Sequence, residues 1–399
     1  MASGRGSRVE YRLVRTPPEP VIPPPLDDAQ RAVVEHAGGP LLVLAGPGTG
    51  KTTTLVEAVA RRVQAGIDTE RIAVLTFSRK AAGELRDRIA RRVGKTTAAP
   101  AASTFHSFCH GLVAAHRPVE DAGVPLRLLS ATEQDVAVRE LLRGTALDGR
   151  PWPAMIARCL DTRGLAEEVR DVLARVGERD VDLRRVAATA DDLETAEVWR
   201  ALGAFADEYA DVLDARGVLD YTELVRRAVG LAESPTVRAQ LRDRFDAVFV
   251  DEYQDSDPGQ VRLLQALAGD GRDLVVFGDP DQSIYAFRGA DVRGILDFPH
   301  AFPDRTGAPA RTLVLRTSRR AVPELLAASR EVARRLPLAG LPAGAARVHR
   351  ELIPALDPGA EPALEVLTFS SVGAELEHVA DVLRRAHLAD GVPWSDMAV

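Results

Sequence analysis

The chain has 399 residues, of which 46% are hydrophobic and 27% are charged, and its formal net charge is −7. This length allows two or three domains, and the composition excludes a chain dominated by disorder. The negative charge argues against a general polyanion binder, because non-specific affinity for nucleic acid depends on basic side chains that neutralise phosphates. A local basic groove remains compatible with it.

The cysteines and the apolar segments restrict the setting of the protein. Cys109 and Cys159 cannot build a disulfide framework, and no group of Cys and His has the spacing of a zinc site. The sequence has no secretory signal pattern and no apolar run near the roughly 18 residues of a membrane span. We therefore expect a cytoplasmic protein without membrane association.

The beginning of the chain divides into an arm and a helix. Residues 1–25 are polar and then rich in proline, which predicts a flexible arm because proline interrupts helices. Residues 26–36 have apolar positions at helical spacing, with Asp27 or Asp28 as N-cap. The amide of Gln30 offers a donor and an acceptor, which suits the edge of an adenine. A solvent-facing glutamine is the alternative.

Residues 40–55, PLLVLAGPGTGKTTTL, contain the strongest pattern in the chain. An apolar run of strand length leads into a glycine-rich turn and then into residues that can start a helix, which is typical of a phosphate-binding loop. The glycines at 46, 48 and 50 allow positive φ, so that backbone N–H groups face a triphosphate at a helix N-terminus. Lys51 would reach the β- and γ-phosphates and Thr52 would bind Mg²⁺, whereas the alternative is an ordinary strand-to-helix turn. We expect the whole turn to line the nucleotide site: Ala45, Gly46, Pro47, Gly48, Thr49, Gly50, Lys51, Thr52 and Thr53.

Two further apolar runs end in polar or aromatic residues. Residues 72–77 predict a buried strand followed by an amphipathic helix, and residues 103–109 predict the end of a third strand. Strands that alternate with helices indicate a parallel sheet, whose ligands gather at the carboxyl ends of the strands. For an isolated Phe or His at this edge, packing is the more common role. The side chains expected there are Thr76, Phe77, Lys80, Thr104, Phe105 and His106.

A helical segment separates these strands from an acidic motif. Residues 112–217 have helical periods with almost no strand-like runs, which predicts a helical insertion, and a further helix starts near Asp220. The sheet pattern resumes at residues 245–250 and leads into D-E-Y-Q-D, residues 251–255. Carboxylates at the end of a buried strand are costly unless they are paired, so this pair suggests Mg²⁺. The alternative is an acidic turn.

Another strand, residues 274–278, leads into D-P-D-Q-S-I-Y-A-F-R-G-A, residues 279–290. This segment combines carboxylates, an amide, two aromatic residues and an arginine. Aromatic rings beside an arginine suit the stacked bases of single-stranded nucleic acid.

The remainder of the chain follows a stretch rich in Gly and Pro that resembles a linker. Strands are predicted from Leu313 and over residues 364–369, and a strong amphipathic helix over residues 375–387. The chain stops at residues 397–399, within what reads as a strand. Because a globular domain rarely ends on an unpaired buried strand, we expect a fragment of a longer protein.

The ordered motifs together resemble those of the UvrD/Rep/PcrA family of superfamily-one DNA helicases. The motifs are L-D-D-A-Q, A-G-P-G-T-G-K-T, L-T-F-S-R-K-A-A, S-T-F-H-S-F, D-E-Y-Q-D and G-D-P-D-Q-S-I-Y-A-F-R-G-A. The resemblance extends from about Leu26 to the end of the chain and is strongest up to Ala290. The arginine-rich style and L-R-T-S-R-R also resemble the actinobacterial AdnA/AdnB helicase-nuclease subunits.

The resemblance implies an α/β fold, with a RecA-like P-loop parallel sheet, a helical insertion and the beginning of a second RecA-like lobe. Residues 26–112 and 217–305 would form the ATPase domain 1A. Residues 113–216 would form the insertion 1B, and residues 306–399 would begin domain 2A.

The resemblance also assigns roles to single residues, with ATP and Mg²⁺ as the ligands. Gln30 would contact adenine, Thr52 and Asp251 would bind Mg²⁺, and Glu252 would activate water beside Lys51. Two glutamines and two arginines would contact or sense the γ-phosphate: Gln254, Gln282, Arg288 and Arg320. Single-stranded DNA would contact Thr76, Phe77, Lys80, Thr104, Phe105, His106, Tyr285 and Phe287.

The chain departs from the family pattern at three places. Thr53 stands where the family has arginine, and Ser318, Arg319 and Arg320 stand where it has N-Y-R, so the contacts that hold adenine are in question. The guanidinium of Arg319 could stack where the tyrosine would. Phe287 replaces a tryptophan and can still stack, over less area.

The function implied is an ATP-driven 3′-to-5′ single-strand translocase and helicase of DNA repair or recombination. Its substrates would be single-stranded DNA and 3′-tailed duplex DNA, with a helicase-nuclease subunit as a possible partner. The alternatives are a DNA-gripping regulatory subunit with weak ATPase activity, and a small-molecule P-loop kinase, which the aromatic-rich strand ends disfavour. Because the second lobe is incomplete, we expect residues 1–399 alone to bind nucleotide but to show little DNA-stimulated ATPase activity and no unwinding.

Overall fold

The computed structural model describes most of the chain. The described residues are 25–94, 101–117, 126–147, 152–179, 181–284, 291–336, 338, 341–356 and 364–399. The predictions for the arm, residues 1–25, and for Tyr285, Phe287 and Arg288 therefore fall outside the described residues, apart from Pro25. Among the described helices, none combines the length and the apolar character needed to cross a membrane.

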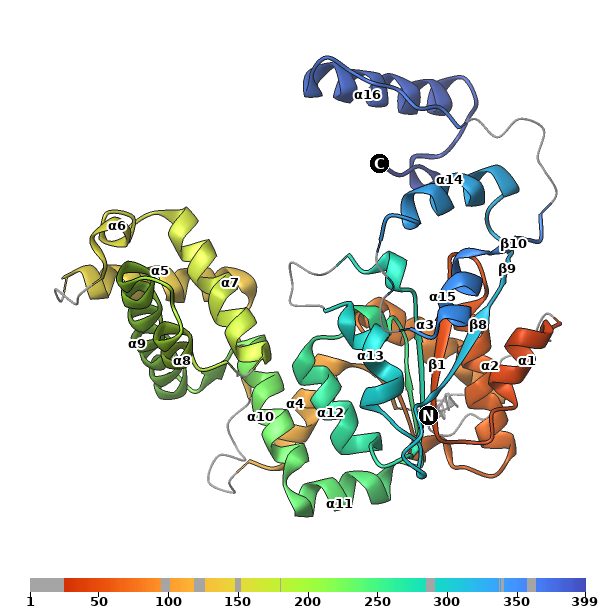
Figure 1. Ribbon diagram of the computed structural model, residues 1–399, viewed down its shortest axis with the longest axis horizontal. Helices are drawn as coiled ribbons and strands as arrows, with labels where there is room; N and C mark the ends of the chain where they lie inside the picture. The colour runs from red at the N-terminus through yellow and green to blue at the C-terminus, as the bar shows by residue number, and fades with distance from the viewer. Residues whose placement is uncertain are drawn as a thin grey trace, which may run out of the picture.

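Six parallel strands form the central sheet, in the order β3-β2-β6-β7-β1-β8 (Figure 1). The strands are β1 (Pro40–Ala45), β2 (Ile72–Thr76), β3 (Ala101–Thr104), β6 (Ala247–Val250), β7 (Asp273–Gly278) and β8 (Arg311–Leu315). Helices connect the strands, which confirms the predicted α/β class. Since all the strands are parallel, their carboxyl ends lie along one edge of the sheet, where the motifs were expected.

Helices cover both faces of the sheet, which explains why its strands read as continuous apolar runs. Along β1, Leu41 and Val43 belong to one buried cluster, whereas Leu42 and Leu44 belong to the other. One face carries α1 (Asp28–Val34), α2 (Lys51–Gln64) and α3 (Arg79–Val93). The other face carries α4 (Phe105–Ala115), α10 (Tyr221–Glu233), α11 (Pro235–Arg244), α12 (Pro258–Ala268) and α13 (Arg293–Ala301).

The predicted helical segment forms a unit with its own buried cluster, which includes Val138, Val169 and Phe205. In Figure 1 this unit lies to one side of the sheet. Its helices are α5 (Ala131–Leu147), α6 (Ala154–Ala157), α7 (Arg163–Arg179), α8 (Leu183–Ala188) and α9 (Leu193–Ala215). Two short parallel strands, β4 (Arg127–Leu128) and β5 (Val218–Leu219), pair at its base and were not predicted.

The strand predicted from Leu313 belongs to the first sheet. β8 pairs in parallel with β1, with Leu313 opposite Val43, and Leu315 is fully buried there. This strand was expected to be the first strand of a second lobe. That assignment is wrong, because β8 is part of the first sheet. Its apolar residues bury more surface by completing the edge of the first sheet than they would alone.

Two other predicted strands, at residues 364–369 and 397–399, are wrong, because neither segment pairs as a strand. Val366 is 87% exposed, so apolar character here does not reflect burial. The predicted helix at 375–387 is confirmed as α16 (Val372–Leu388), although none of its residues is buried. The other elements of this region are β9 (Thr317–Ser318), α14 (Pro323–Ala333), α15 (Ala343–Arg350), β10 (Ile353–Pro354) and the short helix η6 (Trp394–Asp396). The strands β9 and β10 pair with each other.

A buried ion pair fixes α2 against the start of β7. Arg62 Nε and Nη2 donate to the two carboxylate oxygens of Asp273 at 3.0 and 3.1 Å, and both side chains are largely buried. We expect Arg62→Ala to lower the free energy of unfolding by about 3–5 kcal/mol, because it leaves the buried carboxylate unpaired. Urea unfolding measures this, with the exposed neighbour Arg61→Ala as the matched control. Equal losses in the two variants would contradict the prediction.

Candidate active site

The glycine-rich turn connects β1 to α2. Gly48 and Gly50 have φ of 74° and 82°, which confirms the predicted left-handed backbone at these two positions. Gly46 does not share this conformation, and a Cβ there would lie 2.8 Å from Cδ1 of Leu352. The predicted reason for glycine is therefore wrong at position 46, where a Cβ would meet only the end of the flexible Leu352 side chain.

The N-terminus of α2 faces the turn. The helix begins at Lys51, and its N-cap, Gly50, has no side chain to bond the first N–H groups. The first N–H groups of a helix lack partners within the helix and carry its positive dipole end, so they suit an anion. Within the turn, Thr49 Oγ1 donates to the carbonyl of Gly46 at 2.8 Å and stabilises its shape.

A cavity of about 350 Å³ lies over this helix end. Its lining combines the turn with side chains that other elements supply. The lining residues are Ala45, Gly46, Pro47, Gly48, Thr49, Gly50, Lys51, Thr52, Thr53, Arg88, Glu252, Gln282, Arg319 and Arg320. The structure therefore brings the predicted nucleotide-binding turn together with one predicted catalytic carboxylate, one predicted sensing amide and the predicted arginine Arg320.

The acidic pair at the end of β6 lies beside the lysine. Lys51 Nζ forms an ion pair with Glu252 and lies 3.8 Å from Asp251 Oδ1. Asp251 is only 5% exposed, and its backbone N–H donates to the carbonyl of Leu75 at 2.9 Å, which fixes the residue to β2. Glu252 has a φ of 55°, a left-handed conformation that costs energy in a residue with a Cβ. This backbone turns the two consecutive carboxylates toward one cation.

The electrostatics of Asp251 fit a metal ligand. Burial raises the pKa of its carboxyl to about 6, while the charge of Lys51 opposes this rise. Asp251 is therefore ionised at pH 7.5 yet incompletely solvated, and a divalent cation would stabilise it. Carboxylate and hydroxyl oxygens are the ligands that Mg²⁺ prefers, and Thr52 lines the cavity next to Lys51, the residue that lies 3.8 Å from Asp251. The residues present thus fit Mg²⁺.

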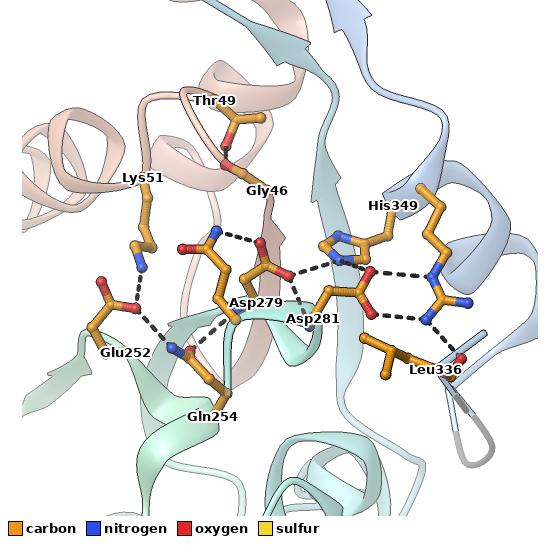
Figure 2. A network of polar contacts seen from close by, with 11 residues as sticks. Gly46, Thr49, Lys51, Glu252, Gln254, Asp279, Asp281, Leu336 and His349 are labelled. Atoms are coloured by element: carbon orange, nitrogen blue, oxygen red, sulfur yellow. Dashed lines mark hydrogen bonds and ion pairs between the residues drawn. The ribbon is translucent and has the colours of Figure 1, made fainter. Parts of the chain in front are cut away.

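Hydrogen bonds through Gln254 link Glu252 to the loop after β7 (Figure 2). Gln254 Nε2 donates to Glu252 Oε2 at 2.9 Å, and Gln254 Oε1 accepts the backbone N–H of Asp279 at 3.0 Å. Gln282 Nε2 donates to Asp279 Oδ2 at 2.6 Å. The two glutamines lie in the short helices η3 (Tyr253–Asp255) and η4 (Pro280–Gln282). Both amides that were predicted to sense the γ-phosphate therefore belong to one network.

Gln30 is buried against the turn, so its solvent-facing alternative is wrong. It is 3% exposed, and its Nε2 donates to the carbonyl of Thr49 at 3.0 Å. Its Oε1 accepts the backbone N–H of Asp27 at 3.1 Å, in the capping box that begins α1. Contact with adenine stays a prediction. It would require at least one of these two hydrogen bonds to be exchanged.

The segment after β8 contacts the turn through Ser318, Arg319 and Arg320. The backbone N–H of Arg319 donates to the carbonyl of Gly48 at 2.9 Å, and Ser318 Oγ donates to the carbonyl of Pro47 at 2.8 Å. The guanidinium of Arg319 pairs with Asp27 at 2.8 Å, near Gln30. Arg319 therefore lies at the predicted adenine end, where its stacking role stays a prediction.

Arg88 is a site residue that sequence reasoning missed. This residue of α3 lines the cavity, and its Nη2 donates to Thr53 Oγ1 at 3.1 Å. Its guanidinium thus reaches the position where the family pattern places an arginine after G-K-T. Helical spacing alone could not reveal this, because the contact depends on how α3 packs against α2.

Of the residues predicted to contact DNA, those that the structure describes lie at the ends of β2 and β3 or in the helices that follow, and several are covered. Phe105 is 1% exposed and lies against Phe77, with ring centroids 5.5 Å apart. Its predicted contact with a base is corrected to packing, because a buried ring offers no face for stacking. Thr76 and Thr104 are also buried, and Thr104 caps α4. Among the described members of the set, Lys80 is exposed, and Phe77 and His106 are partly exposed.

Comparison with known proteins agrees with this geometry. The chain is 32% identical to the ATP-dependent DNA helicase UvrD1 of Mycobacterium tuberculosis over 317 residues, which is 77% of the chain and 39% of the relative. It is 32% identical to UvrD2 of the same organism over 389 residues, 94% of the chain and 51% of the relative. It is 31% identical to DNA helicase II of Escherichia coli over 308 residues, 76% of the chain and 39% of the relative.

The chain thus spans between about two fifths and half of the length of these relatives. The family model of the UvrD/REP helicase N-terminal domain matches residues 26–303, which include the phosphate-binding turn, the acidic pair and the network after β7. The chain therefore belongs to the UvrD/REP helicase family.

Proposed function

We propose that this chain is the ATP-hydrolysing part of a motor that moves along single-stranded DNA and separates duplex DNA. The observation that carries the proposal is that Lys51, Glu252 and Arg320 line one cavity, while the buried Asp251 lies 3.8 Å from Lys51 beside it. Motors of this type need cations on both sides of a triphosphate. The names of the relatives, which are ATP-dependent DNA helicases, support it.

In the proposed mechanism, the N–H groups of the turn and Lys51 hold the phosphates. Asp251 and Thr52 would hold Mg²⁺, which supplies positive charge to the phosphate oxygens when bound. Glu252 would accept the proton of the attacking water, because its carboxylate lies beside Lys51 and is oriented by Gln254. Gln254, Gln282 and Arg320 would contact the γ-phosphate, and positive charge there stabilises the transition state.

We propose that the DNA follows the carboxyl edge of the sheet, over Phe77, Lys80 and His106. The 3′-to-5′ polarity, the 3′-tailed duplex substrate and a role in repair or recombination rest on the family resemblance, as does a helicase-nuclease partner. The division into 1A, 1B and 2A also stays a proposal, with β8 moved into the first lobe. The complete set of Lys51, Asp251 and Glu252 favours a motor over a subunit that only grips DNA.

The test is the rate of ATP hydrolysis by the full-length protein with and without single-stranded DNA. We expect DNA to raise the rate, and the protein to unwind a duplex with a 3′ tail in preference to one with a 5′ tail. ATP hydrolysis that does not respond to DNA would contradict the motor. Preference for the 5′ tail would overturn the polarity alone.

Tyr285 and Phe287, which lie outside the described residues, are the aromatic pair expected to stack on bases. We expect Tyr285→Ala and Phe287→Ala each to weaken binding of single-stranded DNA by about 1–3 kcal/mol, the free energy of one lost stack. Fluorescence anisotropy with a labelled oligonucleotide at fixed salt measures it. The affinity for ATP without DNA serves as the control and should not change. Unaltered DNA affinity in the double variant would assign both rings to packing.

A further inference from the structure

A buried histidine of α15 contacts the loop after β7. His349 is 3% exposed, and its Nε2 lies 3.0 Å from Oδ1 of Asp279, which is 1% exposed. A carboxylate oxygen accepts hydrogen bonds, so we assign the hydrogen of this contact to Nε2 of the ring. In Figure 2 the histidine approaches this loop from the side opposite to Lys51. The contact joins two segments that are 70 residues apart in the sequence.

Asp279 connects this histidine to the proposed catalytic residues. Its Oδ2 accepts from Gln282 at 2.6 Å, and its backbone N–H donates to Gln254 at 3.0 Å. Gln254 in turn donates to Glu252 at 2.9 Å. A continuous series of hydrogen bonds therefore runs from α15 to the carboxylate that would activate water. Both glutamines depend on the position of the one residue that His349 holds.

A hydrogen-bonding role fits this cluster better than a metal site. Asp279, Asp281 and His349 could together surround a cation. However, Arg350 already pairs with both oxygens of Asp281, at 3.1 and 2.7 Å, so its guanidinium supplies the positive charge at this carboxylate. The same guanidinium donates to the carbonyl of Leu336 at 2.8 Å, which anchors it. A metal would have to displace this arginine.

We propose that His349 is a positioning residue for ATP hydrolysis, which holds Asp279 so that Gln282 lines the phosphate cavity and Gln254 stays bonded to Glu252. The inference rests on the proposed function and deepens it, because it makes turnover depend on the docking of α15. Misplacement of a catalytic group by about 1 Å can lower a rate by about 100-fold. Loss of the donor at Nε2 would also remove one hydrogen bond from Oδ1 of the buried Asp279 carboxylate. The loop after β7 would then shift toward other hydrogen-bond donors.

The test compares two polar replacements in the full-length protein, His349→Gln and His349→Asn. A glutamine amide nitrogen reaches the place of Nε2, whereas an asparagine amide nitrogen reaches only the place of Nδ1. We expect His349→Gln to keep kcat for DNA-stimulated ATP hydrolysis within about threefold, and His349→Asn to lower it about tenfold or more. The affinity for ADP, which lacks the γ-phosphate, should change less than about twofold in both. The exposed histidine of α13, in His300→Asn, is the matched control and should behave as the parent.

The kcat of the two His349 variants decides whether His349 positions Asp279 or only packs in the core. Equal kcat in the parent and His349→Asn would overturn the positioning role. Equal losses in His349→Gln and His349→Asn, or a joint loss of kcat and ADP affinity, would also overturn it, because such a pattern indicates general damage to packing. Lys51→Ala in the same assay tests the proposed function independently of the role of His349. If Lys51→Ala and the parent hydrolyse ATP equally, the proposed function itself is wrong.

Discussion

Replacement of Lys51 by alanine should abolish ATP hydrolysis by the full-length protein. The lysine supplies a mobile positive charge at the β- and γ-phosphates, and it also neutralises Glu252 and lies 3.8 Å from Asp251. Loss of one preorganised group that stabilises transition-state charge lowers kcat by about 10²–10³-fold. Without the lysine, the negative charges of Asp251 and Glu252 would also repel the phosphates, which should lower kcat further. Weak nucleotide binding should persist, because the backbone of the turn is unchanged.

Steady-state hydrolysis with single-stranded DNA measures this effect. The matched control is Arg61→Ala, which removes an exposed cation from the same helix. Hydrolysis at the parent rate by Lys51→Ala would show that the turn between β1 and α2 is not the phosphate site.

Glu252→Gln should retain binding of Mg-ATP yet stall turnover, by about 10²-fold or more, because an amide can orient water but cannot accept its proton. Asp251→Asn should instead lose affinity for Mg²⁺, since it removes the buried charge that the metal would neutralise. Titration with a fluorescent ATP analogue at several Mg²⁺ concentrations separates the two effects. If both variants lost Mg-ATP affinity equally, the division of roles would be wrong.

The raised pKa of Asp251 gives the second variant an independent check. Because burial places this pKa at about 6, protonation should weaken Mg²⁺ binding as the pH falls from 7.5 through 6. Asp251→Asn has no carboxyl to protonate at this position. We therefore expect the fall in Mg²⁺ affinity over this range to be smaller in the variant than in the parent.

The fold could be predicted from the sequence for the strands that are buried on both faces of the sheet. β1, β2, β6 and β7 are covered on both faces, so their sequences are continuous apolar runs that indicate strands without an alignment. The failures lie where apolar residues are not buried, as at Val366, or where pairing decides the result, as at Leu313. A strand needs a partner for its backbone groups, and a local sequence does not name that partner.

The site divides in the same way. The turn and the acidic pair could be predicted because each is a continuous segment whose residues act together. Arg88 and His349 could not, because they reach the site only through the packing of helices that are distant in sequence. Phe105 was misjudged for a related reason. Residues 103–109 were predicted as the end of a strand, but β3 ends at Thr104 and Phe105 begins α4, where it is buried and packs against Phe77.

The close fit of the turn against the segment after β8 gives the site a mechanical property. A Cβ on Gly48 would lie 2.5 Å from Cβ of Arg320, and the carbonyls of Pro47 and Gly48 accept hydrogen bonds from Ser318 and Arg319. The turn and residues 318–320 therefore lie in direct contact, with no room for a Cβ at position 48. We therefore expect a movement of the turn on nucleotide binding to be transmitted to residues 318–320 through these two hydrogen bonds.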